Sequence, residues 1–345
     1  MKLKRQISTL IVIMIVLAAV LTGCGGSTSP ETGSSDEPKK EEVKALELSA
    51  SSGGMAASSP AGKAMDFFAE KIAEYSNGTV TVKVFYDSSL GDPTSVVQGM
   101  QKGAVDIAAT GDSYFSGLVP EIQVFELPFL FDSYETARGA VDGPVGQKVM
   151  AKFDGKGIKP LAFWEIGFRH LTNSVRHVKT PDDLQGIKIR TLPAQIQVKT
   201  WEQLGALPTP IDFSELYTSL QQGVVDAQEN PVNLIRTSKF YEVQKYLSLT
   251  GHVYTPMFLA MSQNTWDKLN AEQQDAVMKA AQDAQEYERG LVKDGESDDL
   301  AFIEQQGVTV ERTPEIAKFK EIATQTYSMF TEKYGDELLN ELLGK

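Results

Sequence analysis

The sequence predicts an α/β fold with two lobes, each built on a sheet covered by helices. In residues 186–231, three short strand patterns, at 187–190, 207–211 and 224–227, alternate with two amphipathic helix patterns, an order that implies parallel strands with right-handed crossovers. Residues 101–106 repeat the pattern of residues 221–226 at an offset of 120, so we expect the same helix-to-strand turn in both lobes. Coincidence in a short, common turn is the alternative. With 41% hydrophobic and 23% charged residues, the chain has an ordinary globular composition.

The N-terminus is typical of a secretory signal. Three cations among the first five residues precede an apolar run at 10–21, which is short for a membrane span and suits a signal peptide. The run ends in Leu-Thr-Gly-Cys at 21–24, which resembles a bacterial lipobox. We expect residues 1–23 to be removed and Cys24, the single cysteine, to be lipidated, with an incidental thiol as the alternative.

Residues 24–44 are rich in Gly, Ser, Thr, Pro, Glu and Lys, which predicts a flexible tether between the lipid and the folded body. The chain holds 33 basic and 46 acidic residues, and removal of the signal peptide would take away cations only. This balance argues against nucleic acid and anionic lipid surfaces as partners. It also means that a binder of anions needs a local positive site.

The N-terminal half begins with alternating strand patterns at 46–51 and 79–86. Ser59 and Pro60 predict the start of the helix between them, as N-cap and first helical residue. The apolar run at 124–131 is expected to pack in the core or between lobes. The other expected elements are helices near 133–141 and 145–153, strand 158–164, extended chain at 168–172, a helix at 234–240, extended chain at 246–259, a long helix after a capping box at Asn270 and Gln273, and a last helix from Thr313.

The stretch 186–231 also suggests a binding site. Arg190, Phe213 and Asn230 follow its three strand patterns, with Ser214 as the expected cap of the second helix. Ligands of parallel sheets bind beyond the carboxyl ends of the strands. An arginine grips a carboxylate through two charge-assisted hydrogen bonds, an amide adds a donor, and an aromatic ring covers an apolar face. These side chains therefore favour a carboxylate ligand, although an arginine at a strand end also fits a structural salt bridge.

The same rule gives candidates in the other lobe. Gly111 and Asp112 follow the strand pattern at 105–109, and Asp92 follows a strand and a loop. Trp164 is placed to stack on a ligand. The alternatives are solvated loop positions for both aspartates and a place in the core for the tryptophan.

The sequence offers few signs of catalysis. Its three histidines lack metal-ligand spacing, and no zinc-protease motif, nucleophile elbow or phosphate loop occurs. A pair of carboxylates of the glycosidase type remains an alternative, because acids are plentiful, but no pair stands out. We expect a binding protein without cofactor or metal and not an enzyme.

Four motifs resemble the solute-binding receptors of tripartite ATP-independent periplasmic (TRAP) transporters, in the branch for C4-dicarboxylates and sugar acids. The resemblance runs from about Leu46 to the C-terminus, and Ala227 stands where the family often has glycine. The motifs are Gly-Phe-Arg-His-Leu-Thr-Asn-Ser at 167–174, Asp-Leu-Gln-Gly-Ile-Lys-Ile-Arg at 183–190, Gly-Ala-Leu-Pro-Thr-Pro at 205–210 and Gln-Gly-Val-Val-Asp-Ala-Gln-Glu-Asn-Pro at 222–231.

The resemblance implies a two-lobed periplasmic-binding-protein fold, similar to type II, with the ligand cleft between the lobes and a long helix bracing both. Lobe one would comprise 45–167 plus about 256–295, and lobe two 168–255 plus about 296–345. The family implies that Arg190 pairs with the ligand carboxylate, that Arg169 assists, and that Phe213 and Asn230 line the pocket.

The function so implied is that of a monomeric, lipid-anchored extracytoplasmic receptor. It would bind an organic acid, either a C4-dicarboxylate or a sugar acid such as a uronate, and deliver it to TRAP permease subunits in the membrane. The alternatives are a ligand-sensing lipoprotein of a signalling system and a cell-envelope hydrolase.

Overall fold

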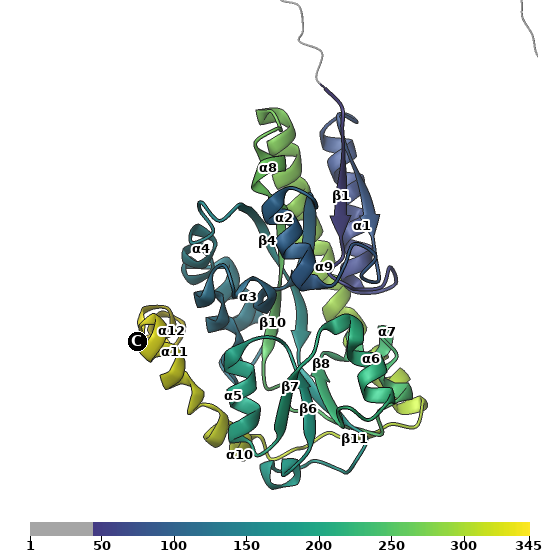
Figure 1. Ribbon diagram of the computed structural model, residues 1–345, viewed down its shortest axis with the longest axis vertical. Helices are drawn as coiled ribbons and strands as arrows, with labels where there is room; N and C mark the ends of the chain where they lie inside the picture. The colour runs from purple at the N-terminus through teal and green to yellow at the C-terminus, as the bar shows by residue number, and fades with distance from the viewer. Residues whose placement is uncertain (1–43) are drawn as a thin grey trace, which may run out of the picture. The chain divides into compact units, whose positions relative to one another are not determined.

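The computed structural model describes residues 44–345, and the expected signal peptide, Cys24 and most of the tether lie outside this part (Figure 1). Two mixed sheets carry the two lobes. The first has the strand order β2-β1-β3-β10-β4 and the second β11-β9-β5-β8-β6-β7. The strands are β1 Leu46–Ser51, β2 Val80–Phe85, β3 Ile107–Gly111, β4 Ile158–Phe168, β5 His170–Asn173, β6 Lys188–Thr191, β7 Leu207–Pro210, β8 Ala227–Asn230, β9 Tyr246–Ser248, β10 Tyr254–Ser262 and β11 Thr309–Glu311.

Helices cover both sheets, and most begin near the predicted residues. Ser59 caps the first of them by accepting a hydrogen bond from the backbone N–H of Gly62 at 3.0 Å, as its place before Pro60 predicted. The helices are α1 Pro60–Tyr75, α2 Pro93–Lys102, α3 Tyr134–Asp142, α4 Pro144–Ala151, α5 Gln195–Gln203, α6 Phe213–Gln221, α7 Val232–Thr237, α8 Gln263–Trp266, α9 Ala271–Gln305, α10 Ile316–Ala323, α11 Thr326–Tyr334 and α12 Glu337–Leu342, with short 3₁₀ turns η1 Asp112–Phe115, η2 Pro120–Glu126, η3 Pro181–Leu184 and η4 Phe240–Glu242.

The parallel arrangement predicted for residues 186–231 is confirmed, because β6 pairs in parallel with both β7 and β8. Two local predictions were wrong. The third strand is Ala227–Asn230 and not 224–227, since Val224 is exposed in the preceding turn. The helix α6 begins at Phe213 after Asp212, so Ser214 lies inside the helix and is not its cap.

The repeated turn occurs in both lobes. Gly103 and Gly223 follow their helices with φ of 74° and 70°, a left-handed conformation that glycine adopts without strain. The aspartate three residues later then accepts a hydrogen bond from the backbone of a neighbouring strand. Asp106 accepts a hydrogen bond from the backbone N–H of Ser49 at 2.8 Å, and Asp226 accepts one from that of Lys188 at 3.0 Å. The sequence echo therefore reflects one structural device used twice.

Two crossings and one long helix join the lobes. The chain passes from the first sheet to the second between β4 and β5, and returns between β9 and β10 (Figure 1). The 35 residues of α9 correspond to a length of about 50 Å. Val277 and Ala281 near the start of α9 pack in the core of the first lobe, and Ile303 near its end packs in a core of the second. The expected bracing helix is thus present.

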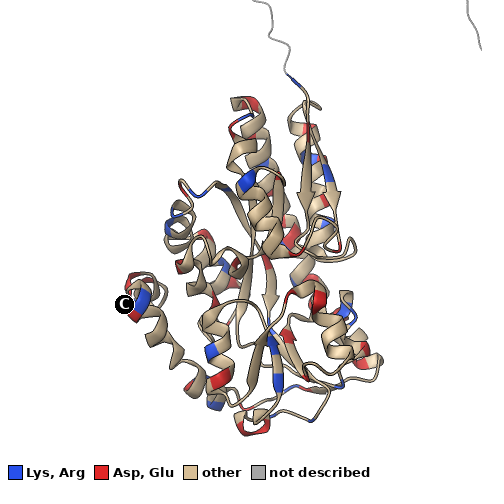
Figure 2. Ribbon diagram, viewed as in Figure 1, with Lys and Arg blue, Asp and Glu red and all other residues tan. Residues whose placement is uncertain are grey.

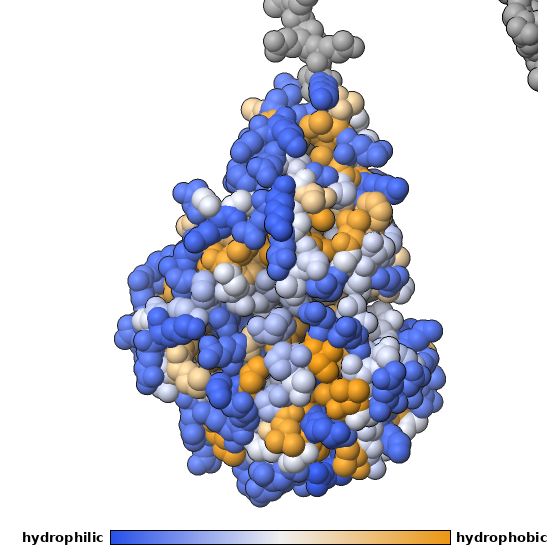
Figure 3. Space-filling model, in the orientation of Figure 1, coloured by the Kyte–Doolittle hydropathy of each residue, from blue (hydrophilic) through white to orange (hydrophobic). Residues whose placement is uncertain are grey.

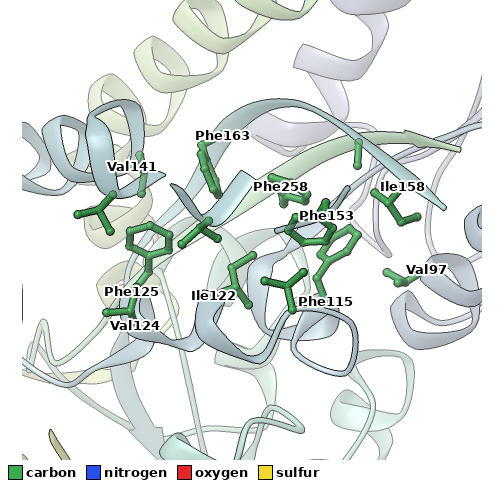
Figure 4. Close-up of a cluster of buried hydrophobic side chains, with 14 of the residues drawn as sticks. Val97, Phe115, Ile122, Val124, Phe125, Val141, Phe153, Ile158, Phe163 and Phe258 are labelled. Carbon is green, nitrogen blue, oxygen red and sulfur yellow. The ribbon is translucent and has the colours of Figure 1, made fainter. Parts of the chain in front are cut away.

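A cluster of phenylalanines forms much of the first lobe's core (Figure 4). Phe115, Phe153 and Phe258 have ring centroids 4.8–5.8 Å apart. Phe330 and Leu338 from the C-terminal helices join the same cluster. Residues 296–345 were expected in lobe two. Within this range β11 joins the second sheet and Phe319 of α10 packs in the core of that lobe, whereas α11 and α12 pack on the core of lobe one.

The surface is polar and mixed in charge. Acidic and basic residues are scattered over both lobes (Figure 2), and hydrophilic residues cover much of the face in Figure 3, with hydrophobic residues between them. Between residues 44 and 345, no helix combines the length and the apolar character that a membrane span requires.

Candidate functional site

A small, nearly closed cavity of about 10 Å³ lies between the two sheets and is lined from both lobes. The predicted Gly111 lines it from lobe one, and Arg169, Phe213 and Asn230 line it from lobe two or the crossing. The ends of parallel strands therefore meet there, as the carboxyl-end rule predicted. The complete lining is Gly53, Met55, Gly111, Tyr114, Ile166, Arg169, Leu192, Phe213, Asn230 and Leu234.

Arg190 is fully buried at the end of β6, behind this lining. Its Nε donates a hydrogen bond to the carbonyl of Ile211 at 2.8 Å, which fixes the guanidinium in place. Its Nη1 and Nη2 atoms have no partner among the described residues. Burial lowers the pKa of Arg190 below its ordinary value, yet an arginine keeps its charge in proteins. Two donors of a buried cation are thus available for an anion.

Arg169 has a different role, because Glu229 already balances its charge. The two side chains form a buried bidentate ion pair, in which Nη2 donates to Oε1 at 2.9 Å. Burial acts to raise the pKa of Glu229, but Arg169 and His252 outweigh it and hold that pKa at about 2. Arg169 also donates to Oδ1 of Asn230 at 3.0 Å, so it orients the amide that lines the cavity. The pair is a positioning element and not a free cation.

Tyr114 lines the cavity and lies near Arg190. Its hydroxyl is buried without a hydrogen-bond partner in the described chain. Burial raises the pKa of Tyr114, and the nearby charge of Arg190 acts in the opposite direction. The phenol therefore stays protonated and offers a donor beside the free nitrogens of Arg190.

Asp112 is buried next to the site but does not line the cavity. Its Oδ1 accepts a hydrogen bond from the N–H of Ser113 at 2.8 Å, and its Oδ2 has no partner among residues 44–345. Burial, with the neighbouring carboxylate of Glu126, raises the pKa of Asp112 well above its ordinary value. Glu126 in turn accepts a hydrogen bond from Gln197 of the second lobe. Asp112 thus belongs to a contact between the lobes.

Two predicted site residues lie elsewhere. Asp92 is the N-cap of α2 and accepts hydrogen bonds from the N–H and hydroxyl of Ser95 at 3.0 and 2.7 Å, so its carboxylate serves the helix. Trp164 is fully buried in the core of the first lobe and meets Phe68 edge to face at 6.4 Å between centroids. Neither residue lines the cavity, because capping and core packing take up their side chains.

Other residues of the site were missed from the sequence. Tyr114 lines the cavity and follows the candidates Gly111 and Asp112 closely, and Glu229, the partner of Arg169, lies within the motif at 222–231, so the position of each in the sequence was an indication of its role. Met55 and Leu192 are apolar loop residues, a type that gives no sign of a binding role in a single sequence.

A larger, open groove of about 830 Å³ runs along α9. Among its charged groups, Arg236 pairs with Asp299 at 2.6 Å, and the side chain of Arg236 is partly exposed to solvent. The cavity between the lobes, with its unpaired buried cation, is therefore the stronger candidate. In residues 44–345, no cluster of three or more His, Cys, Asp or Glu is arranged to hold a metal ion.

The two-lobed α/β fold and a cavity between the lobes define the class of periplasmic binding proteins. The chain belongs to bacterial extracellular solute-binding protein family 7 (DctP), whose model matches residues 51–333. The members of this family that the chain resembles are solute-binding receptors of TRAP transporters and not enzymes.

Relatives with named ligands support this membership. The 2,3-diketo-L-gulonate-binding periplasmic protein YiaO of Escherichia coli is 39% identical over 70% of this chain and 74% of its own length. The C4-dicarboxylate-binding periplasmic protein DctP of Rhodobacter capsulatus is 32% identical over 83% of this chain and 86% of its own. The structure of the sugar acid binding protein DctPAm from Advenella mimigardefordensis with galactonate superposes with a TM-score of 0.85, at 36% identity, covering 88% of this chain and 98% of that one.

Proposed function

We propose that this protein binds an organic acid in the cavity between its lobes and delivers it to the membrane subunits of a TRAP transporter. The observation that carries the proposal is Arg190, a fully buried cation with two unpaired nitrogens. A buried charge of this kind costs free energy unless an anion compensates it. A ligand carboxylate that accepts both hydrogen bonds would supply that compensation.

The other residues have supporting roles in this proposal. Arg169 holds the amide of Asn230 toward the ligand, and Tyr114 adds a hydroxyl donor beside Arg190. Phe213 covers one side of the ligand, and Gly111 allows close approach from lobe one. These contacts involve both lobes, so they form together only when the lobes are closed.

Closure of the lobes is the conformational step that we propose. Contacts already cross between them, including Gln197 to Glu126 and the hydroxyl of Thr94 to Asp212 at 3.5 Å. A ligand that touches both walls binds the closed form better and shifts the population toward it. A permease that recognises the closed form would then receive only loaded receptor.

The first test is the Arg190→Ala variant. Removing the charge partner of a buried carboxylate costs about 2–5 kcal/mol, so we expect affinity to fall at least about 30-fold for any acid that binds the wild type. Isothermal titration calorimetry measures the change. Arg176→Ala is the matched control, because Arg176 is exposed and lies outside the cavity lining. Equal affinities of R190A and wild type would contradict the proposed clamp.

We also propose lipid anchoring through Cys24, which lies outside the described residues. The support is the sequence at 21–24 and the polar stretch that follows it. Mass spectrometry of the membrane-extracted protein should find acyl chains on an N-terminal Cys24, and a Cys24→Ala variant should leave the membrane fraction. An unmodified wild-type protein of full length would contradict this part alone.

A further inference from the structure

Two buried carboxylates lie side by side at the contact between the lobes. Asp112 belongs to η1 and Glu126 ends η2, and their side chains are 0% and 1% exposed. The two carboxyl groups are within hydrogen-bonding reach of each other. Each has one oxygen, Oδ2 of Asp112 and Oε1 of Glu126, that has no partner among residues 44–345. These two residues are called the acid pair below.

The hydrogen bonds that reach the acid pair come from neutral groups. The N–H of Ser113 donates to Oδ1 of Asp112 at 2.8 Å, and the amide of Gln197 donates to Oε2 of Glu126. Two negative charges side by side in such a dry place would repel each other without compensation. A single proton between the two carboxyl groups removes one charge and gives both free oxygens a partner.

The charged group that faces the acid pair is the guanidinium of Arg169. Its charge is already balanced by Glu229, to which His252 also bonds at 3.0 Å, and it therefore does not neutralise the pair. Arg190 and Tyr114 lie on the other side of Arg169, near the cavity. The remaining ionisable side chains on the surrounding elements are engaged elsewhere, Glu121 of η2 with Lys152, Lys199 of α5 with Glu202, and Tyr254 of β10 with Glu165.

The second lobe covers the acid pair through α5. Gln197 is 3% exposed, and its neighbour Ile196 packs in the same core cluster as Phe125 of lobe one. When the lobes part, α5 withdraws and water reaches both carboxylates, which then ionise at neutral pH as hydrated carboxylates do. In the closed form, burial and the neighbouring Glu126 raise the pKa of Asp112 well above its ordinary value. The open and closed forms therefore differ by one proton at this place.

We propose that the acid pair takes up one proton from solvent when the lobes close on a ligand, and that this proton joins Oδ2 of Asp112 to Oε1 of Glu126. An O–H bond forms on one carboxyl group and the other accepts the hydrogen bond, while water or buffer supplies the proton. Asp112 is then a positioning residue, because it acts through closure and does not touch the ligand. The inference rests on the proposed function, since it requires that an organic acid closes the lobes.

Calorimetry at pH 7.5 counts the protons that binding takes up. Succinate and galactonate are titrated into the purified protein, after unfolding, dialysis and refolding to remove any bound ligand. The titrations are done in phosphate and in Tris, two buffers with different enthalpies of ionisation. Both probes are already ionised at this pH, so they exchange no proton themselves. We expect wild-type protein to take up close to one proton per bound ligand, and Asp112→Asn to take up almost none.

The pH dependence of affinity gives a second readout. One proton taken up on binding raises the dissociation constant by up to about tenfold for each unit of pH. Between pH 6.5 and 8, we expect a rise of at least about fivefold in the wild type and less than about twofold in D112N. Asp154→Asn is the matched control, because Asp154 is exposed on lobe one, and it should behave as the wild type does.

A second variant keeps the test decisive if D112N does not fold, which circular dichroism would detect. Glu126→Gln also replaces one member of the acid pair by a neutral amide, so that the pair carries one charge at every pH. It should abolish proton uptake in the same way. A merely structural role predicts instead that binding weakens at every pH while proton uptake stays as in the wild type.

The outcomes separate this inference from the proposed function. Binding that depends on Arg190 but takes up no proton, or takes up the same number in D112N and E126Q, would overturn the inference and leave the receptor function intact. Failure of a wider panel of organic acids to bind the refolded protein would overturn both.

Discussion

At the scale of residues, the main feature is that Arg169 and Arg190 have different roles. Both are buried arginines near the same cavity, but only Arg169 has an acidic partner. A residue that is already paired can orient its neighbours, whereas an unpaired cation draws in a ligand. The pattern of hydrogen bonds, and not the residue type, therefore distinguishes the two roles.

Breaking the buried pair should destabilise the protein. Glu229→Ala leaves the charge of Arg169 without its partner, which costs about 3–5 kcal/mol in comparable buried pairs. Urea unfolding should show a clearly lower midpoint, with little change in the m-value, which is the slope of the unfolding free energy against urea concentration. The exposed pair of Lys199 and Glu202 provides the control, since Glu202→Ala should change stability by less than about 1 kcal/mol. Equal effects of the two variants would contradict a stabilising role for Glu229.

Acid should destabilise the fold through His170. Burial, with a smaller effect of His252, lowers the pKa of His170 from 6.5 to about 3. The folded state thus binds the proton less readily than the unfolded state, so the stability present above pH 6.5 is progressively lost as the pH falls toward 3. Between pH 6.5 and 5 the loss should be about 2 kcal/mol.

Stability curves measured by urea at several pH values would detect this loss. The His170→Asn variant should be less stable at neutral pH but show a flatter profile between pH 6.5 and 5. Glu229 adds a further loss only below pH 4.5, because its folded pKa is about 2. A profile in this range that is as steep in the variant as in the wild type would exclude His170 as its source.

Residue types explain which site residues the sequence could predict. Arg190 and Asn230 were recognisable because a charged or amide side chain at the end of a strand pattern is unusual enough to attract attention. Leu192 and Met55 carry no such mark, and only the folded chain brings them to the cavity. Trp164 was misleading because a large aromatic residue suits a core and a ligand site equally well.

At the scale of elements, the turn used twice shows how local chemistry sets the ends of helices. Gly223→Ala forces a side chain into a left-handed conformation with φ of 70°, at a position where nothing else lies within 4 Å. We expect a loss of about 1–2 kcal/mol from the backbone alone. Gly117→Ala is the control, because Gly117 has equal space and no such φ. Thermal unfolding should lower the midpoint of the first variant by several degrees and hardly change the second.

The elements were predictable where two signals agreed. An N-cap residue followed by proline marked the start of α1, and Asn270 with Gln273 marked that of α9 as a capping box. The strand 227–230 was placed three residues too early because three of its four residues, Gln228, Glu229 and Asn230, are polar yet buried, while the apolar Val224 is exposed. Tertiary context overrode the local pattern there.

At the scale of the whole molecule, α9 should make both lobes unfold together. Its ends pack in different cores, through Val277 in one lobe and Ile303 in the other. We expect a single calorimetric transition over the described chain, with equal calorimetric and van't Hoff enthalpies. Val277→Ala and Ile303→Ala should each lower the midpoint of that one transition. Two resolved peaks, with each variant shifting a different one, would contradict this coupling.

The position of β10 has a consequence for synthesis and export. In the first sheet β10 lies between β3 and β4, and β4 pairs with no other strand in it. A nascent chain that has not yet reached Tyr254 therefore cannot join β4 to the sheet, although most residues of that lobe have already been made. The lobe stays incomplete until late, which slows folding because distant segments must meet. A chain that remains unfolded while it emerges is well suited to threading through a narrow translocation channel.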